Sequence, residues 1–95
     1  TPVEPDDVRN AIAEETLLSR NPASRLAFVD DGANALMFFA DGACFDCAAE
    51  TAELARDLCA QDALVLDSAL ASVDAAIDLL TQLCNMGCIA FESED

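Results

Sequence analysis

The chain has 95 residues, which is enough for one small domain built around a single hydrophobic core. Nineteen acidic residues face four arginines, with no lysine or histidine, so the formal net charge is −15. This balance argues against nucleic-acid binding, which requires a basic surface, and the absence of histidine excludes Ser-His-Asp catalysis and His₂-carboxylate iron sites within the chain. Apolar runs are only a few residues long, so the sequence predicts no membrane span and a cytoplasmic location.

Residues 1–5 contain two prolines, which disfavour a helix, and are predicted to form a linker. Asp6 is the expected N-cap of a short amphipathic helix. The apolar side of this helix holds residues at helical spacing: Val8, Ala11 and Ile12. Leu17 and Leu18 are expected to extend that buried side, and a loop is predicted over residues 19–24.

The stretch 26–45 organises the rest of the predicted fold. The runs RLAFVD, ALMFFA and ACFDC are typical of three strands, and the turns DDGAN and Asp41-Gly42 join them. Asp-Gly between apolar runs favours a type I′ hairpin turn, in which both central residues have positive φ. The sequence therefore predicts an antiparallel three-stranded meander.

The two faces of this meander are predicted to differ. Alternation along the second run puts Leu36 and Phe38 on one face, with Met37 and Phe39 on the other. Four of the five phenylalanines lie in the meander. We therefore expect it to supply most of the large core side chains, with the later helices covering one of its faces.

After Cys47 the apolar spacing changes from two residues to about 3.6, which predicts a helix over residues 48–60. One side of this helix is apolar: Leu54, Ala55, Leu58 and Cys59. The short apolar piece 64–70 is predicted to form one helical turn, capped by Asp67 or Ser68.

The clearest helical pattern lies near the C-terminus. Ser72 is its expected N-cap, and Gly87 is the C′ residue that ends it. Strict helical spacing holds between them for Val73, Ala76, Ile77, Leu80, Leu83 and Cys84. Residues 88–91 are predicted to form a final strand that pairs back onto the meander.

Together these elements predict an α+β domain close to a winged-helix fold. It consists of the three-stranded meander plus a closing strand, packed against two or three helices. The domain is predicted to span residues 6–92, and a solvated acidic tail follows at 93–95. The charge of −15 suits adaptation to salt or a composition rich in alanine and aspartate. The less favoured interpretation is an acidic face that meets a basic partner.

Five cysteines bring metal and redox chemistry into question. Cys44 and Cys47 form a C-x-x-C pair, and Cys84 and Cys88 form a C-x-x-x-C pair. On a strand, residues i and i+3 point to opposite faces. The two thiols of the first pair could therefore bind the same zinc ion only if they lay in a knuckle turn and not in a strand. Acids beside Cys47 are expected to raise the pKa of its thiol, which argues against redox catalysis. We interpret the cysteines as free thiols in a reducing cytoplasm.

The acids offer no better candidate for chemistry. Paired acids occur at 6–7, 14–15 and 30–31, but no EF-hand loop pattern surrounds them, so they are interpreted as solvated surface. Asp74 and Asp78 lie one helical turn apart, where a DNA-reading helix would carry arginine. The sequence therefore predicts no catalytic, cofactor-binding or metal-ligating residue in this chain.

Three segments in order carry a family resemblance: EPDDVRNAI, RLAFVDDGANALMFFADGACFD and LLTQLCNMGCIAFE. They resemble the C-terminal winged-helix domain of bacterial JmjC-type (cupin) ribosomal oxygenases, closest to the branch that hydroxylates an arginine of a large-subunit ribosomal protein. That branch has a closing signature Leu-Leu-x-x-Leu-x-Asn-x-Gly-x-x-x-Phe, which residues 79–91 match. Its second hairpin usually carries Asn-Gly-Glu, where this chain has Asp41-Gly42-Ala43. The resemblance covers residues 4–92.

The resemblance implies that the catalytic machinery lies outside these residues. In that family a His-x-Asp and a distant His bind Fe(II), and the 2-oxoglutarate site belongs to an upstream JmjC barrel that a dimerisation region follows. The chain is then expected to be the non-catalytic accessory domain of an Fe(II)/2-oxoglutarate-dependent ribosomal-protein arginine hydroxylase, excised from a longer protein. Its expected partners are its own upstream domains and a basic ribosomal protein.

The alternative is a free-standing acidic interaction module that binds a basic partner, for example by adding a peptide strand to the edge of the meander. The coding sequence before Thr1 separates the two hypotheses. Iron ligands encoded upstream favour the oxygenase domain, and a start codon favours the free-standing module.

Overall fold

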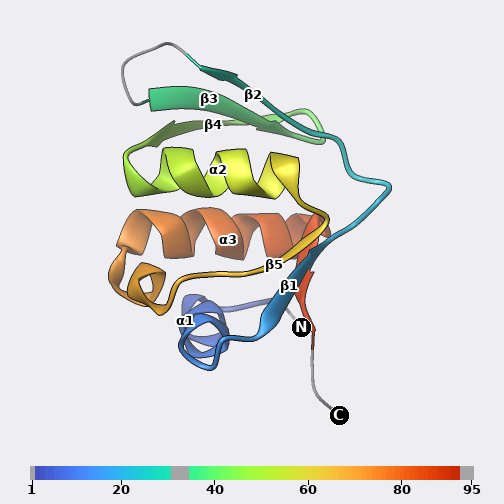
Figure 1. Cartoon of the computed structure of the whole chain (residues 1–95). Coiled ribbons are helices and arrows are strands. Elements are labelled where there is room, and N and C mark those ends of the chain that lie inside the picture. The colour runs from blue at the N-terminus through green and yellow to red at the C-terminus, as the bar shows by residue number, and fades with distance from the viewer. Residues whose placement is uncertain (1, 31–34, 93–95) are drawn as a thin grey trace.

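The computed structural model describes residues 2–30 and 35–92 of the chain. Within these ranges three α-helices, one 3₁₀ helix and six strands form an α+β domain with two small antiparallel sheets, which confirms the predicted fold class. The elements in chain order are α1 (Pro5–Ala13), β1 (Leu17–Arg20), β2 (Leu26–Asp30), β3 (Ala35–Ala40), β4 (Ala43–Ala48), α2 (Glu50–Ala60), β5 (Ala63–Val65), the 3₁₀ helix η1 (Ser68–Ser72), α3 (Asp74–Met86) and β6 (Ile89–Phe91). Figure 1 shows them stacked, with the meander at one end, α2 and α3 in the middle and α1 at the other end.

The predicted meander is present as the sheet β2-β3-β4. At its second turn Asp41 has φ of 47° and Gly42 has φ of 90°, so both values are positive as a type I′ turn requires. Ala40 pairs directly with Ala43 across this turn. The hairpin prediction is therefore confirmed, whereas the other predicted turn, at 31–34, lies outside the described residues.

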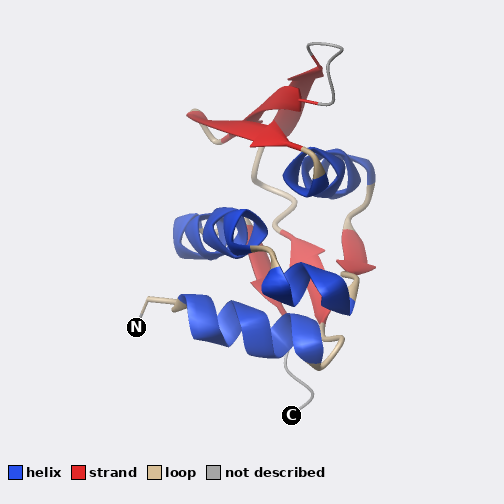
Figure 2. Ribbon diagram, turned by 90° about the vertical axis from the view of Figure 1, so that its left-hand side faces the viewer, coloured by secondary structure: helices blue, strands red, loops and turns tan. Residues whose placement is uncertain are grey.

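One face of the meander is covered and the other is exposed, as predicted. Figure 2 shows a helix on one side of this sheet, and that helix is α2. Leu36, Phe38 and Ala40 are buried on the covered face. On the other face Phe39 is 38% exposed and Val29 is 62% exposed.

The expectation that the meander supplies most of the large core side chains is wrong. Of the largest fully buried side chains in the described residues, only Phe38 comes from the meander. The others come from the helices, from β1 and from the residue before β6: Val8, Ile12, Leu18, Leu58, Ile77, Leu80, Leu83 and Cys88. The meander lies at one end of the stack, so only one of its faces reaches the core.

The second sheet, in the order β5-β1-β6, corrects four predictions. Leu18, expected to extend a helix side, sits in the central strand β1, opposite Leu64 of β5 and Phe91 of β6. The predicted loop at 19–24 therefore begins as strand, and part of the predicted turn at 64–70 is strand β5. The closing strand β6 pairs with β1 and not with the meander.

Capping chemistry sets the helix ends, with small differences from the prediction. The N-cap of α1 is Glu4 and not Asp6, because Pro5 already occupies the first helical position, where its missing N–H needs no partner. The Glu4 N–H donates to Asp7 Oδ2 at 3.0 Å. This bond holds the start of the helix two residues earlier than the sequence pattern indicated.

The C-terminal half of the chain keeps most of its predicted caps. Asp67 caps η1 by accepting the Ala69 N–H at 2.9 Å, as predicted. Ser72 belongs to η1, so the N-cap of α3 is Val73 instead. Gly87 ends α3 with φ of 82°, a left-handed conformation that glycine adopts without strain.

The segment before α1 contacts the end of α3. Val3 N–H donates to Asn85 Oδ1 at 2.7 Å, and Asn85 Nδ2 donates to the Val3 carbonyl at 3.1 Å. The domain limits at 6–92 stay a prediction, and the predicted tail at 93–95 lies outside the described residues. Over the described ranges, no helix has both the length and the apolar character that crossing a bilayer demands.

Candidate functional site

The structure separates the two cysteines of the C-x-x-C pair, as strand periodicity predicts. Cys44 lies on the exposed face of β4, opposite Phe39, and Cys47 lies on the buried face, opposite Leu36. Burial raises the pKa of the Cys47 thiol, and the neighbouring Asp46 carboxylate raises it further. Since the thiolate is the reactive form, Cys47 is a poor nucleophile at neutral pH.

The second cysteine pair is also structural in character. Burial raises the pKa of Cys84 to about 11, and it raises the pKa of Cys88 as well. The Cys88 thiol donates to Asp41 Oδ2 at 3.4 Å, which links the start of the closing strand to the meander turn. Among residues 2–30 and 35–92, no three His, Cys, Asp or Glu side chains come together as metal ligands.

The paired acids of the sequence lie at the surface. Asp6 forms an ion pair within α1 at 3.2 Å. Asp30 forms an ion pair with Arg56 of α2 at 2.5 Å, which joins the meander to that helix. The pair at 14–15 is exposed beyond α1, and Asp31 lies outside the described residues. The acids of these pairs that the structure describes are exposed, as the sequence indicated.

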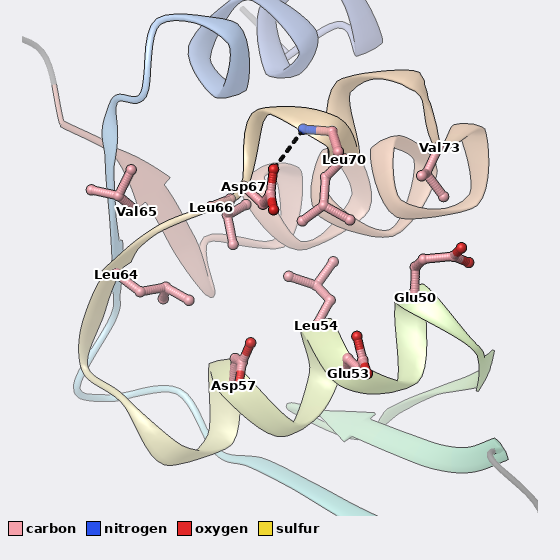
Figure 3. Close-up of a pocket in the computed structure, with 11 residues that line it drawn as sticks. Glu50, Glu53, Leu54, Asp57, Leu64, Val65, Leu66, Asp67, Leu70 and Val73 are labelled. Carbon is pink, nitrogen blue, oxygen red and sulfur yellow. Dashed lines mark hydrogen bonds between the residues drawn. The ribbon is translucent and has the colours of Figure 1, made fainter.

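A groove lies between α2 and the segment that runs from β5 into η1 (Figure 3). Its volume is about 410 Å³, which falls in the range of about 300–1,000 Å³ that is usual for binding clefts. Apolar side chains form its floor: Leu54, Leu64, Leu66, Leu70 and Val73. Leu54 and Leu66 are 2% and 6% exposed, so the floor is continuous with the hydrophobic core.

Four carboxylates form the rim of this groove. Glu50, Glu53 and Asp57 follow one another along α2, spaced by three and four residues, so they share one side of the helix. Asp67 lies across the groove from them, at the start of η1, as Figure 3 shows. The rim is therefore negative on both sides of an apolar floor.

None of the ion pairs within the described residues involves this rim. Arg56 precedes the rim residue Asp57 in sequence, but it pairs with Asp30 of the meander. Arg20 pairs with Asp62 at 2.7 Å and donates to carbonyl oxygens at the end of α2. The negative charge of the groove is thus left without an arginine from the described part of the chain.

Sequence reasoning missed this groove. The sequence pattern predicts a helix over residues 48–60 and a separate helical turn over residues 64–70, with no contact between them. The signal was present as the spacing of Glu50, Glu53, Leu54 and Asp57, which is i, i+3, i+4 and i+7 on one helix side. The groove appears only once β5 and η1 pack across from that side, which the sequence pattern does not show.

The chemistry of this groove is that of a binding surface. Apolar groups gain by leaving water on its floor, and positive groups gain from carboxylates at its edge. Phosphates and other anions are repelled by the same rim. The arrangement therefore fits a ligand that is both apolar and basic.

Comparisons with known proteins agree on the fold. A family model described as ROXA-like winged helix matches residues 1–90. No curated protein sequence matches the chain. Solved structures of the ribosomal oxygenase YcfD from Escherichia coli match with a TM-score of 0.77, including one in complex with cobalt and 2-oxoglutarate. A third, in complex with cobalt and succinic acid, has a TM-score of 0.72.

The match covers nearly all of this chain but only a small part of each solved chain. It covers 97% of this chain but only 24% of the solved chains, at 20% sequence identity. The chain thus spans about a quarter of the proteins that it resembles in structure. At this identity the likeness concerns the fold alone.

Proposed function

Because the chain belongs to the ROXA-like winged-helix family, we propose that it is the accessory domain of an Fe(II)/2-oxoglutarate-dependent ribosomal-protein arginine hydroxylase and contributes to protein interaction. The family match over residues 1–90 is the observation that carries this proposal. The matching Escherichia coli structures are described as a ribosomal oxygenase, and two of them hold cobalt. The oxygenase chemistry is transferred here from those relatives.

In this proposal the domain is non-catalytic. The chain has no histidine, so it does not contain the His-x-Asp and distant His that bind iron in such oxygenases. The described residues also bring no three candidate ligands together. The residues present therefore do not fit Fe(II), and the metal and 2-oxoglutarate are assigned to a separate domain of the same polypeptide.

The proposed partners are that catalytic domain, its dimerisation region and a basic ribosomal protein. Support for the basic partner comes from the net charge of −15 and from the groove, whose four rim carboxylates form no ion pair among the described residues. A second candidate function, a free-standing acidic module in the cytoplasm, rests on the same groove. It differs only in lacking an oxygenase partner domain.

The first test is the coding sequence upstream of Thr1. We expect a stretch that encodes His-x-Asp and a later His, and a start codon at that point would support the free-standing module instead. The whole protein, supplied with Fe(II) and 2-oxoglutarate, is then expected to add one oxygen to an arginine of a ribosomal protein, read by mass spectrometry. Deleting residues 1–95 is expected to weaken substrate affinity or the dimer. Unchanged affinity and dimer stability would contradict the accessory role.

A further inference from the structure

The groove beside α2 specifies the chemistry of its occupant more closely than net charge does. Resting on the proposed interaction role, we infer that this groove binds a protein segment in which an apolar side chain is flanked by arginine or lysine residues. The apolar side chain enters the groove, and the flanking cations reach the carboxylates on its two sides. Each part of this inference follows from a separate feature of the groove.

The apolar anchor follows from the floor. Leu54 projects from α2 toward Leu70 on the opposite wall, and Leu64 closes one end, as Figure 3 shows. These side chains offer no hydrogen-bonding atoms, so they cannot orient a polar group. Leu54 is already buried, so the surface left to cover is that of the half-buried Leu64, Leu70 and Val73. An apolar side chain placed on these residues removes further apolar surface from water. A ligand made only of charged groups would leave this surface wet.

The flanking cations follow from the rim. Glu50 and Asp57 are seven residues apart on α2, which is about 10 Å along a helix axis, and Asp67 stands on the other wall. Carboxylates this dispersed do not form a metal site, and none is found among the described residues. Several separate cations on one partner chain match them better than a single ion.

The acidic rim does not simply mirror the composition of the chain. A second groove of similar volume, about 460 Å³, lies beside β1 and β6 and includes Arg20 and Asn21 but no carboxylate among its lining residues. A third, about 350 Å³, has only Asp46 and Asp78. The groove beside α2 therefore gathers more acids than these two, and more leucine and valine side chains.

The test uses fluorescent peptides and the 95-residue chain. The first peptide carries a central leucine between pairs of arginines, the second has alanine in place of that leucine, and the third has glutamate in place of every arginine. Fluorescence anisotropy is expected to show binding of the first peptide, about tenfold weaker binding of the second because less apolar surface is buried, and none of the third. A higher NaCl concentration is expected to weaken binding of the first peptide, because salt screens the attraction between its arginines and the rim carboxylates.

Matched variants locate the site. The double substitution Glu53→Gln with Asp57→Asn removes two charges from the rim, and Asp46→Asn with Asp78→Asn removes two charges around another groove. The first variant is expected to bind the leucine peptide about tenfold more weakly and the second less than twofold, since close charges dominate. Circular dichroism checks that both remain folded.

The outcomes separate this inference from the proposed function. Equal losses in the two double variants, equal binding of the leucine and alanine peptides, or no binding of either would overturn the groove assignment. Binding of an intact basic ribosomal protein is measured in parallel. If the wild-type chain and the groove variant bind that protein equally well, the interaction role stands, and the assignment of binding to the groove is wrong. If the wild-type chain fails to bind it, the basic ribosomal partner is wrong.

Discussion

The two sheets of this domain are built in opposite ways. The meander β2-β3-β4 comes from one continuous stretch of chain, and a tight turn at Asp41-Gly42 fixes the register of its second hairpin. The sheet β5-β1-β6 is assembled from three segments far apart in sequence, and Leu18 in its central strand is fully buried. Local turn chemistry thus supports the first sheet, and packing against the helices supports the second. Damage to the first is expected to stay local, whereas damage to the second should affect the whole domain.

The largest effect is expected from Leu18→Ala. Leu18 is 0% exposed and pairs with both neighbouring strands. Its truncation leaves a cavity in the core, which costs about 2–5 kcal/mol of unfolding free energy. Leu17→Ala is the matched control, because Leu17 lies in the same strand but is 38% exposed. Urea denaturation followed by circular dichroism measures both variants. Similar losses for the two would show that core packing does not support the second sheet.

A smaller and more local effect is expected from Gly42→Val. The position has φ of 90°, and an added Cβ meets no atom within 4 Å, so the cost is backbone strain alone. A left-handed conformation costs a residue with a Cβ about 1–2 kcal/mol, and β-branching does not relieve it. Cys44→Val, at an exposed strand position of the same hairpin, is the control.

Hydrogen exchange shows whether this damage stays in the meander. Amides of β3 and β4 are expected to exchange faster in Gly42→Val, while those of β1 and β6 keep their protection. Equal acceleration in both sheets would mean that the domain opens as one unit. The distinction between a sheet stabilised by its own turn and a sheet stabilised by packing in the core would then be wrong.

The same difference explains what the sequence predicted. The hairpin at Asp41-Gly42 and the end of α3 at Gly87 depend on residues adjacent in the chain, and both predictions are confirmed. Strand β1 holds only two apolar residues before Ser19 and Arg20, so its pattern is too short to separate from a helix end. Its identity comes from pairing with β5 and β6, which are distant in sequence.

The groove was unpredictable for the same reason. Its acidic side on α2 can be seen in the sequence, but the opposite wall comes from β5 and η1. The sequence pattern predicted those residues as a single turn, without indicating what they face. A site formed by two segments can be recognised only when the fold places them across from each other. The separation of Cys44 and Cys47, in contrast, could be predicted from the alternation of side chains along a single strand.

Two arginines provide a comparison of the ion pairs of the two sheets. Arg20 of β1 pairs with Asp62 and also donates to the carbonyl oxygens of Leu58 and Cys59 at 3.1 and 3.2 Å. Within the part of the chain that the structure describes, Arg56 pairs with Asp30 of the meander and donates to no backbone carbonyl. Exposed pairs contribute about 0–1 kcal/mol, and hydrogen bonds from a charged donor contribute more.

We therefore expect Arg20→Gln to lower the urea midpoint more than Arg56→Gln, which should change it only slightly. Both variants change the net charge equally, so a difference between their urea midpoints cannot come from charge repulsion within the chain. A larger loss for Arg56→Gln would indicate that the ion pair, not the carbonyl contacts, governs the effect.

The smallest effect concerns the turn that touches both halves of the molecule. Asp41 accepts the Arg25 backbone N–H at 2.7 Å, and this bond, with further bonds from Ser24 and the Cys88 thiol, lowers the pKa of its carboxyl group. A carboxylate with a lowered pKa adds stability above its ordinary value of 3.8, and this stability is lost as the pH falls through the folded value. Asp41→Asn lacks the titrating group. The gap in urea midpoint between wild type and this variant is therefore expected to narrow from about pH 6 to about pH 3.

The comparison with a variant removes the effect of the other acids, whose protonation relieves self-repulsion in both proteins alike. Asp46→Asn, at an exposed acid of β4, controls for the loss of one charge. A gap for Asp41→Asn that stays constant would mean that the carboxylate is no better held in the folded chain than in the unfolded one. The hydrogen bonds that Asp41 accepts from Arg25 and Cys88 would then add no pH-dependent stability to the fold.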